Sequence, residues 1–203
     1  DCTPCNDSSA HPLVCTPWPA KSGPAPLIAG PSRAIFCTGV AVAKAMNIFV
    51  LDQDIRRCAR HHCDAHVSKM ILESVQILCT ALNKKGFSTP YRSTHVNHPC
   101  VLWAGESWDN FRWLARLARA LNAEYRYRYG RRGDHASIAV LDQVEKLRFE
   151  SRGLTEFAQA MPEQYKVPGD AVAAYRSFYR AEKRAFARWT RRAPPAWWTR
   201  DAA

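Results

Sequence analysis

The chain has 203 residues, of which 47% are hydrophobic and 23% are charged, and its formal net charge is +11. This length suffices for one domain with a buried core. No apolar run reaches the roughly 18 residues of a membrane span, so we expect no membrane partner. The positive charge fits many basic proteins and favours an anionic partner, most often nucleic acid.

The first 45 residues differ in composition from the rest. Proline is frequent there, charged residues are few, and the segment has no helical or alternating hydrophobic period. We predict a disordered or loosely packed Pro-rich extension over residues 1–45. Cys2 and Cys5 have the spacing of half a zinc knuckle, but no second close pair accompanies them. Met46 begins the well-patterned segment MNIFVLD, and one hypothesis is that it is the natural start.

The remainder of the chain, residues 46–203, is predicted to form a single compact all-α domain. Its first segment, Asn47–Leu51, is β-branched and aromatic, which indicates an edge strand or an extended lead-in. Asp52 or Asp54 then caps a short helix that runs through Cys63.

Four longer helices follow in the prediction, with ends placed by cap residues, glycines and prolines. They span residues 64 to about 86, 99–129, 135–148 and 170–192. Asp134 and Asp170 are the expected caps of the last two. Residues 87–97 and 151–169 are predicted loops, the second with one turn at 155–160.

The helix that begins at Asp64 is apolar on most of its circumference and has one polar stripe. Residues at steps of three and four line this face, namely His66, Lys69, Glu73 and Gln76. Burying a carboxylate and an amine costs free energy unless they pair or change ionisation, and that cost is often tolerated where chemistry happens. Two interpretations stay open: a Lys69–Glu73 ion pair that fixes helix packing, and a functional site.

Two other segments are suited to phosphate. THVNHP, residues 94–99, places His95, Asn97 and His98 before a helix start, where backbone N–H groups attract anions. Ordinary capping by Asn97 explains the same pattern.

The second of these segments, residues 124–132, interleaves four arginines, Arg126 and Arg128 among them, with three tyrosines. Tyrosines stack on bases and arginines bind phosphates, although Glu124 and Arg128 are also spaced to pair with each other. Farther along, arginines recur at steps of four from Arg176 to Arg188, as on a solvated face or a phosphate-tracking surface.

Histidines and cysteines give a weaker metal signal. His62 and His66 stand four apart, but the spacing of the neighbouring Cys and His residues fits no strong zinc pattern. We therefore expect no metal and no cofactor. Cys58, Cys63 and Cys79 lie in helical sequence and read as reduced apolar residues, which indicates a reducing, cytoplasmic compartment.

The run D-x-H-x6-E, formed here by Asp64, His66 and Glu73, resembles the catalytic helix of the pyrimidine-dimer DNA glycosylases of the phage endonuclease V type. A related bacterial branch carries a lysine and a glutamine on this helix, as Lys69 and Gln76 do here. The order of later motifs also fits over residues 46–135, namely His98-Pro99, Trp103, Glu106 and Glu124…Arg128…Gly130. The chain also resembles uncharacterised phage and bacterial proteins that begin MNIFVLD.

This resemblance implies a DNA glycosylase/AP lyase, in which an amine attacks the sugar C1′, a Schiff base forms and the strand breaks by β-elimination. Glu73 would be the acid/base residue, and Lys69 or a processed N-terminus would supply the amine. His66 would position the sugar or phosphate, and Leu72 stands where the family places an arginine. Further residues are expected to bind the substrate or its phosphates: Gln76, His95, Asn97, His98, Arg126 and Arg128.

The expected partner is double-stranded DNA, bound by a monomer. The alternatives are a metal-dependent nucleotide or nucleic-acid hydrolase that uses His62, His66 and Glu73, and a non-catalytic nucleic-acid-binding helical domain.

Overall fold

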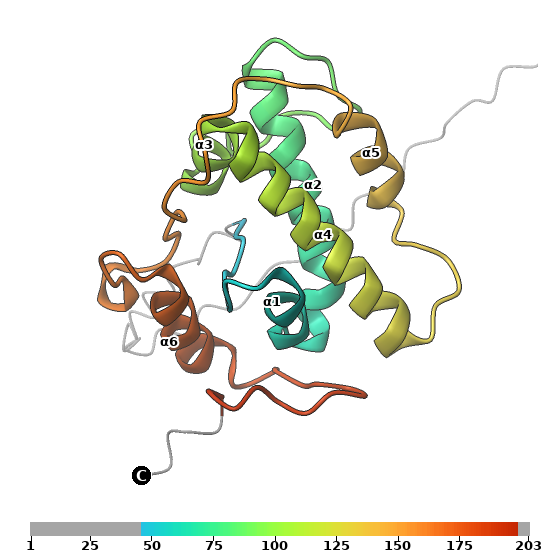
Figure 1. Cartoon of the computed structure of the whole chain (residues 1–203). Coiled ribbons are helices and arrows are strands. Elements are labelled where there is room, and N and C mark those ends of the chain that lie inside the picture. Colours follow the sequence, from blue (N-terminus) through green and yellow to red (C-terminus); the bar gives the residue numbers. More distant parts are fainter. Residues whose placement is uncertain (1–45, 199–203) are drawn as a thin grey trace, which may run out of the picture. The chain divides into compact units, whose positions relative to one another are not determined.

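Two long helices cross at the centre of the fold (Figure 1). In the computed structural model, which describes residues 46–198, these are α2 (Asp64–Lys84) and α4 (Trp108–Tyr129). α1 (Ile55–His61) packs on α4, while α3 (Pro99–Glu106) and α5 (Ser137–Val144) contact both long helices. α6 (Ala171–Lys183) follows a 3-10 turn at Glu163–Tyr165 and packs against it.

Residues 46–198 contain helices and no strand, which confirms the all-α prediction for this part of the chain. The predicted extension, with its zinc interpretation, lies outside the described residues. No helix in 46–198 is long and apolar enough to span a bilayer. The four cysteines of this part are free and buried: Cys58, Cys63, Cys79 and Cys100.

The core forms where the apolar faces of the long helices meet. Its largest enclosed side chains on these helices are Met70, Ile71, Ile77, Leu78, Leu82, Phe111, Leu114 and Leu117. The segment before α1 is not an edge strand. It is a lead-in without regular secondary structure, with a φ of 37° at Phe49, and it runs through this core with Ile48 and Leu51 enclosed. Tyr175 and Tyr179 of α6 cover the lead-in and are themselves fully buried. The lead-in is therefore an integral part of the domain.

The predicted helix 99–129 is two helices, because the chain is extended at Ser107, with φ −141° and ψ 144°. The Ser107 hydroxyl accepts a hydrogen bond from the backbone N–H of Asp109 and caps α4. The backbone N–H of Trp108 donates to the carbonyl of Glu150, at 2.9 Å, instead of to a helical partner. A long-range contact thus ends α3 where the local pattern predicted continuation.

Three further boundaries differ from the prediction. The helix expected at 135–148 is limited to α5, and Asp134 accepts from the side chain of Asn122 instead of capping it. The helix expected at 170–192 ends at Lys183, because the chain after it bonds to the start of α2. The turn expected at 155–160 is not helical, and the 3-10 turn comes after it.

Candidate functional site

The polar stripe of α2 opens into a cavity of about 520 Å³. Lys69, Glu73 and Gln76 form one wall of this cavity, and Met46 of the lead-in lies beside them. The opposite wall is the segment from Tyr91 to His95. Of the nine predicted site residues, the structure brings four together here: Lys69, Glu73, Gln76 and His95.

An amine and a carboxylate are paired inside the cavity. Lys69 Nζ lies 3.0 Å from Glu73 Oε1, one turn along the helix. The Glu73 side chain is only 10% exposed, whereas that of Lys69 is 36% exposed and reaches toward solvent. The other carboxylate oxygen, Oε2, accepts a hydrogen bond from the backbone N–H of Asn47 at 3.3 Å. Glu73 is therefore held in place from two sides, with the more accessible amine next to it.

The lead-in is anchored at the same point. The Asn47 side chain donates to the carbonyl of Ala160 at 2.8 Å and accepts from the N–H of Ile48 at 2.7 Å. These bonds fix the backbone nitrogen that faces Glu73.

The segment from Tyr91 to His95 is fixed by hydrogen bonds to α2. The backbone N–H of Thr94 donates to Thr80 Oγ1, and the Asn83 side chain donates to the carbonyl of Tyr91. His95 has a φ of 49°, in the left-handed region, and its Nδ1 lies 2.7 Å from Thr94 Oγ1. Arg92 and His95 are exposed on this wall. The wall thus presents a guanidinium and an imidazole opposite the Lys69–Glu73 pair.

His66 shares the stripe with Lys69 but does not line the cavity. Its Nδ1 lies 2.7 Å from the hydroxyl oxygen of Tyr179, and its ring stacks on Phe49 with 4.7 Å between centroids. Burial lowers the pKa of His66 to about 2, so the ring is neutral at physiological pH. In the structure His66 joins α2 to α6, and its predicted role toward a sugar or phosphate stays a prediction.

Asn97 and His98 also lie outside the cavity. His98 is the N-cap of α3, and its Nδ1 accepts a hydrogen bond from the backbone N–H of Cys100 at 3.2 Å. The segment THVNHP therefore caps α3, as its simpler interpretation predicts, but the capping residue is His98 and not Asn97. Asn97 is exposed in the loop before it.

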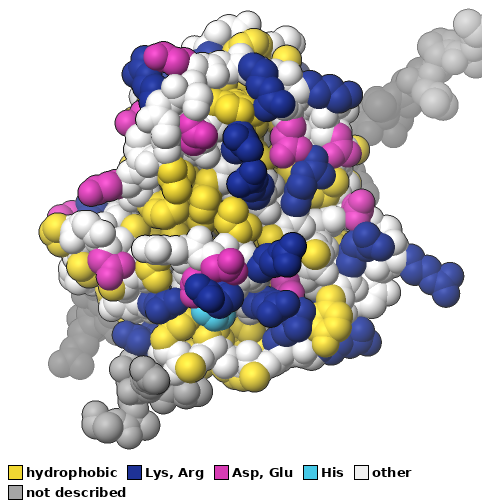
Figure 2. All heavy atoms as spheres, in the orientation of Figure 1, with side chains coloured by type: hydrophobic (Ala, Val, Ile, Leu, Met, Phe, Trp, Pro, Cys, Tyr) yellow, Lys and Arg dark blue, Asp and Glu magenta, His cyan; other side chains and the backbone are white. Residues whose placement is uncertain are grey.

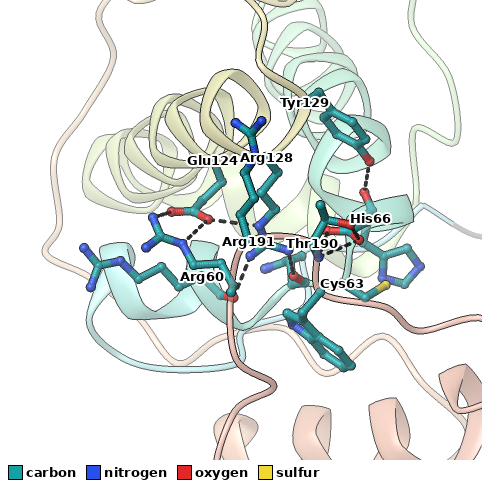
Figure 3. A network of polar contacts seen from close by, with 12 residues as sticks. Arg60, Cys63, His66, Glu124, Arg128, Tyr129, Thr190 and Arg191 are labelled. Carbon is teal, nitrogen blue, oxygen red and sulfur yellow. Dashed lines mark hydrogen bonds and ion pairs between the residues drawn. The ribbon is translucent and has the colours of Figure 1, made fainter.

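Arg128 is enclosed in a polar network at the end of α4 (Figure 3). Its side chain is 0% exposed, and it donates to Glu124 Oε2, to Asp64 Oδ1 and to the carbonyls of Arg60 and His62. Of the two interpretations of residues 124–132, a nucleic-acid surface and a Glu124–Arg128 pair, the structure contains the pair.

Arg126, by contrast, is exposed, and its nearest carboxylate is Asp134, at 3.4 Å. Neither Arg126 nor Arg128 lines the cavity. The guanidinium of Arg128 is not presented to a ligand.

No cluster of metal-donor side chains within residues 46–198 supports the metal-dependent alternative. Within residues 46–198, no three His, Cys, Asp or Glu side chains are grouped so that they could hold a metal ion. His62 is buried, with its Nδ1 donating to the carbonyl of Cys58 at 2.8 Å, and His66 is taken up by Tyr179. The set His62, His66 and Glu73 is therefore not assembled as a metal site.

Six cavity residues were not among the predicted site residues, namely Met46, Leu72, Tyr91, Arg92, Ser93 and Thr94. Met46 lies five residues before Leu51, the end of a hydrophobic run, and this pattern indicates only a buried start of the domain. Arg92 lies in a predicted loop, where a lone arginine carries no signal. The contacts of the 91–95 segment with α2 place it, and these are visible only in three dimensions.

No family model, no curated protein and no solved structure matches this chain in comparisons with known proteins.

Proposed function

We propose that the protein is a DNA glycosylase/AP lyase that acts through an amine in the cavity on α2. The observation that supports this proposal is the 3.0 Å contact between Lys69 Nζ and Glu73 Oε1 in a cavity that also presents Arg92 and His95. An amine next to a carboxylate is what imine chemistry at a sugar carbon requires, since one group attacks and the other moves protons.

On an abasic site the amine nitrogen adds to the C1′ aldehyde, water leaves, and an imine remains. Glu73 as carboxylate takes a proton from C2′, and the electron pair of that bond expels the 3′ phosphate. On an intact nucleotide the first step is displacement of the base from C1′ by the same amine. Arg92 and His95 lie on the wall where a flanking phosphate would be neutralised.

Two amines fit this cavity. Lys69 is the side-chain candidate, and its partial exposure leaves it accessible to a sugar. A chain that starts at Met46 would place a terminal amine in the same cavity, next to the Asn47 nitrogen that contacts Glu73. Both sources give the same imine, and they differ in where the adduct forms.

Borohydride trapping on abasic DNA tests the proposal, because reduction of the imine joins protein and DNA covalently. We expect an adduct with the 203-residue chain or with a chain that starts at Met46. If Lys69 is the attacking amine, Lys69→Ala abolishes the adduct. With either amine, Glu73→Gln slows strand cleavage about 10²- to 10⁴-fold. Lys146→Ala is the matched control, because Lys146 is exposed and lies outside the cavity.

Peptide mapping of the adduct identifies the amine. An adduct on Lys69 or on the amine of Met46 supports the cavity as the active site. An adduct on another lysine, or no adduct with either form of the chain on abasic or dimer-containing DNA, refutes the proposal.

A non-catalytic nucleic-acid-binding domain is the second candidate, and the exposed arginines of residues 46–198 favour it. It predicts salt-sensitive DNA binding that is unchanged in Glu73→Gln, without any trapped adduct.

A further inference from the structure

A second concave surface lies on the outer side of α4, away from the residues of the cavity. It is a groove of about 1240 Å³ between α1 and α4, closed at one end by residues 154–157. Figure 2 shows an apolar patch on this face of the molecule, bordered by Lys and Arg side chains. The groove and the cavity on α2 share no residue.

Every basic residue that lines the groove is an arginine, and three of these arginines have no carboxylate partner. Arg56 and Arg60 stand one turn apart on α1, and Arg116 faces them from α4. All three are exposed, and none forms an ion pair within residues 46–198. The groove therefore has positive charge on both walls that the protein itself does not neutralise.

The acidic groups of the groove are already occupied. Glu124 accepts two hydrogen bonds from Arg192, at 3.0 and 2.7 Å, and one from Arg128. Asp54 caps α1 by accepting from the backbone N–H of Arg57 at 2.8 Å. Neither carboxylate is paired with Arg56, Arg60 or Arg116, and the two acidic residues that line the groove are outnumbered by its five arginines.

The lining between the arginines is apolar and partly aromatic. It includes Trp113, Ala120, Ala123, Tyr127 and Phe157. Tyr127 is 46% exposed, and the guanidinium of Arg192 lies 4.2 Å from the centre of its ring. Leu154, 51% exposed, extends the apolar surface.

We propose that this groove binds single-stranded nucleic acid, with phosphates at Arg56, Arg60 and Arg116 and with bases over Tyr127 and the apolar lining. Aromatic faces combined with a positively charged channel are the usual means of binding single strands without sequence preference. Arginine suits this role because its planar guanidinium both pairs with phosphate oxygens and stacks on rings.

An acidic peptide is the other polyanion that the arginines could bind. We favour nucleic acid because the groove combines unpaired guanidinium groups with an exposed aromatic ring, Tyr127, on which a base can stack. A nucleic acid offers a flat apolar face at every repeat, and the net charge of +11 favours a polyanion of this kind.

Fluorescence anisotropy with a labelled oligothymidylate tests the proposal on the 203-residue chain. We expect the double variant Arg60→Ala/Arg116→Ala to bind about tenfold more weakly at low salt. The slope of log K against log salt becomes shallower by about 1.4, since each phosphate contact on a single strand contributes about 0.7. Tyr127→Leu, which removes a ring, weakens binding about fivefold or more.

The control is the double variant Lys146→Ala/Arg184→Ala, which removes the same charge from exposed positions outside the groove. Equal weakening in both double variants would overturn the proposal, because the effect would be one of net charge. Polyglutamate that binds as tightly as the oligonucleotide, with the same loss in Arg60→Ala/Arg116→Ala, would overturn it in favour of an acidic peptide.

The inference is independent of the proposed lyase activity. Arg60 and Arg116 line the groove and not the cavity, so the loss in their double variant reports on the groove whatever the result of the trapping experiment.

Discussion

Replacing Arg128 by methionine removes the most enclosed charge of the polar network at the end of α4. Its guanidinium makes hydrogen bonds of 2.7 Å to the carbonyls of both Arg60 and His62, the last groups of α1. Such carbonyls have no partner within their own helix. The same side chain lies 3.0 Å from Glu124 and 3.2 Å from Asp64. Arg128 thus makes hydrogen bonds or ion pairs to groups of α1, α2 and α4 at once.

The size of the stability loss follows from the hydrogen bonds that each partner of Arg128 loses. Glu124 keeps Arg192 and Asp64 keeps Thr190, so neither carboxylate is left alone. The two carbonyls lose their donors, at about 1 kcal/mol or more each, and two charge-assisted bonds disappear, at about 1.5 kcal/mol each. We expect Arg128→Met to lower the free energy of unfolding by about 3–5 kcal/mol, the range for a broken buried ion pair.

Urea unfolding followed by circular dichroism measures this loss. With a slope near 2 kcal/mol per molar urea, the midpoint should fall by about 1.5–2.5 M. Arg126→Met is the control, since Arg126 lies on the same helix but is exposed, and its ion pair should contribute at most about 1 kcal/mol. If the two variants lose the same stability, or if Arg128→Met loses less than about 1 kcal/mol, the reasoning is refuted.

Two further predictions concern the contact between α2 and α6. Tyr179→Phe removes the hydroxyl that accepts from the N–H of Cys63 and lies 2.7 Å from His66 Nδ1. Urea unfolding should show a free energy of unfolding lower by about 2 kcal/mol. An unchanged midpoint would contradict this. Burial lowers the pKa of His62 to about 4 and that of His66 to about 2, both below the unfolded value of about 6.5. The unfolded chain therefore binds more protons below pH 6.5, so stability that is complete above this pH should fall by about 1.4 kcal/mol per pH unit for each histidine down to about pH 4. Equal urea midpoints at pH 7 and pH 5 would contradict the assignment.

Local signals in the sequence were enough to predict the helices, and long-range bonds decided where they break. Hydrophobic spacing and cap residues placed α2 and the starts of α3 and α6 correctly. The break at Ser107 depends on the carbonyl of Glu150, which accepts from Trp108. No pattern within one helix contains that information, because the two partners belong to different parts of the chain.

The candidate site shows the same contrast between local spacing, which the sequence reveals, and long-range packing, which it does not. Helical spacing put Lys69, Glu73 and Gln76 on one face, and all three line the cavity. His66 continues the same series, yet Tyr179 and Phe186 cover it. The covering residues come from more than a hundred positions later, so the sequence could predict the face but not which part of it stays open.

The bond between Asp64 and Thr190 joins residues 126 positions apart, at the beginning of α2 and near the end of the described chain. On the ribosome, where chains grow at about 5–20 residues per second, Asp64 would wait about 6–25 s for this partner. During that interval α2 can form, while the cover that Tyr179 gives to His66 does not yet exist. The nascent chain would therefore leave the start of α2, with Asp64 and His66, without its final partners for seconds after the rest of that helix has packed on α4.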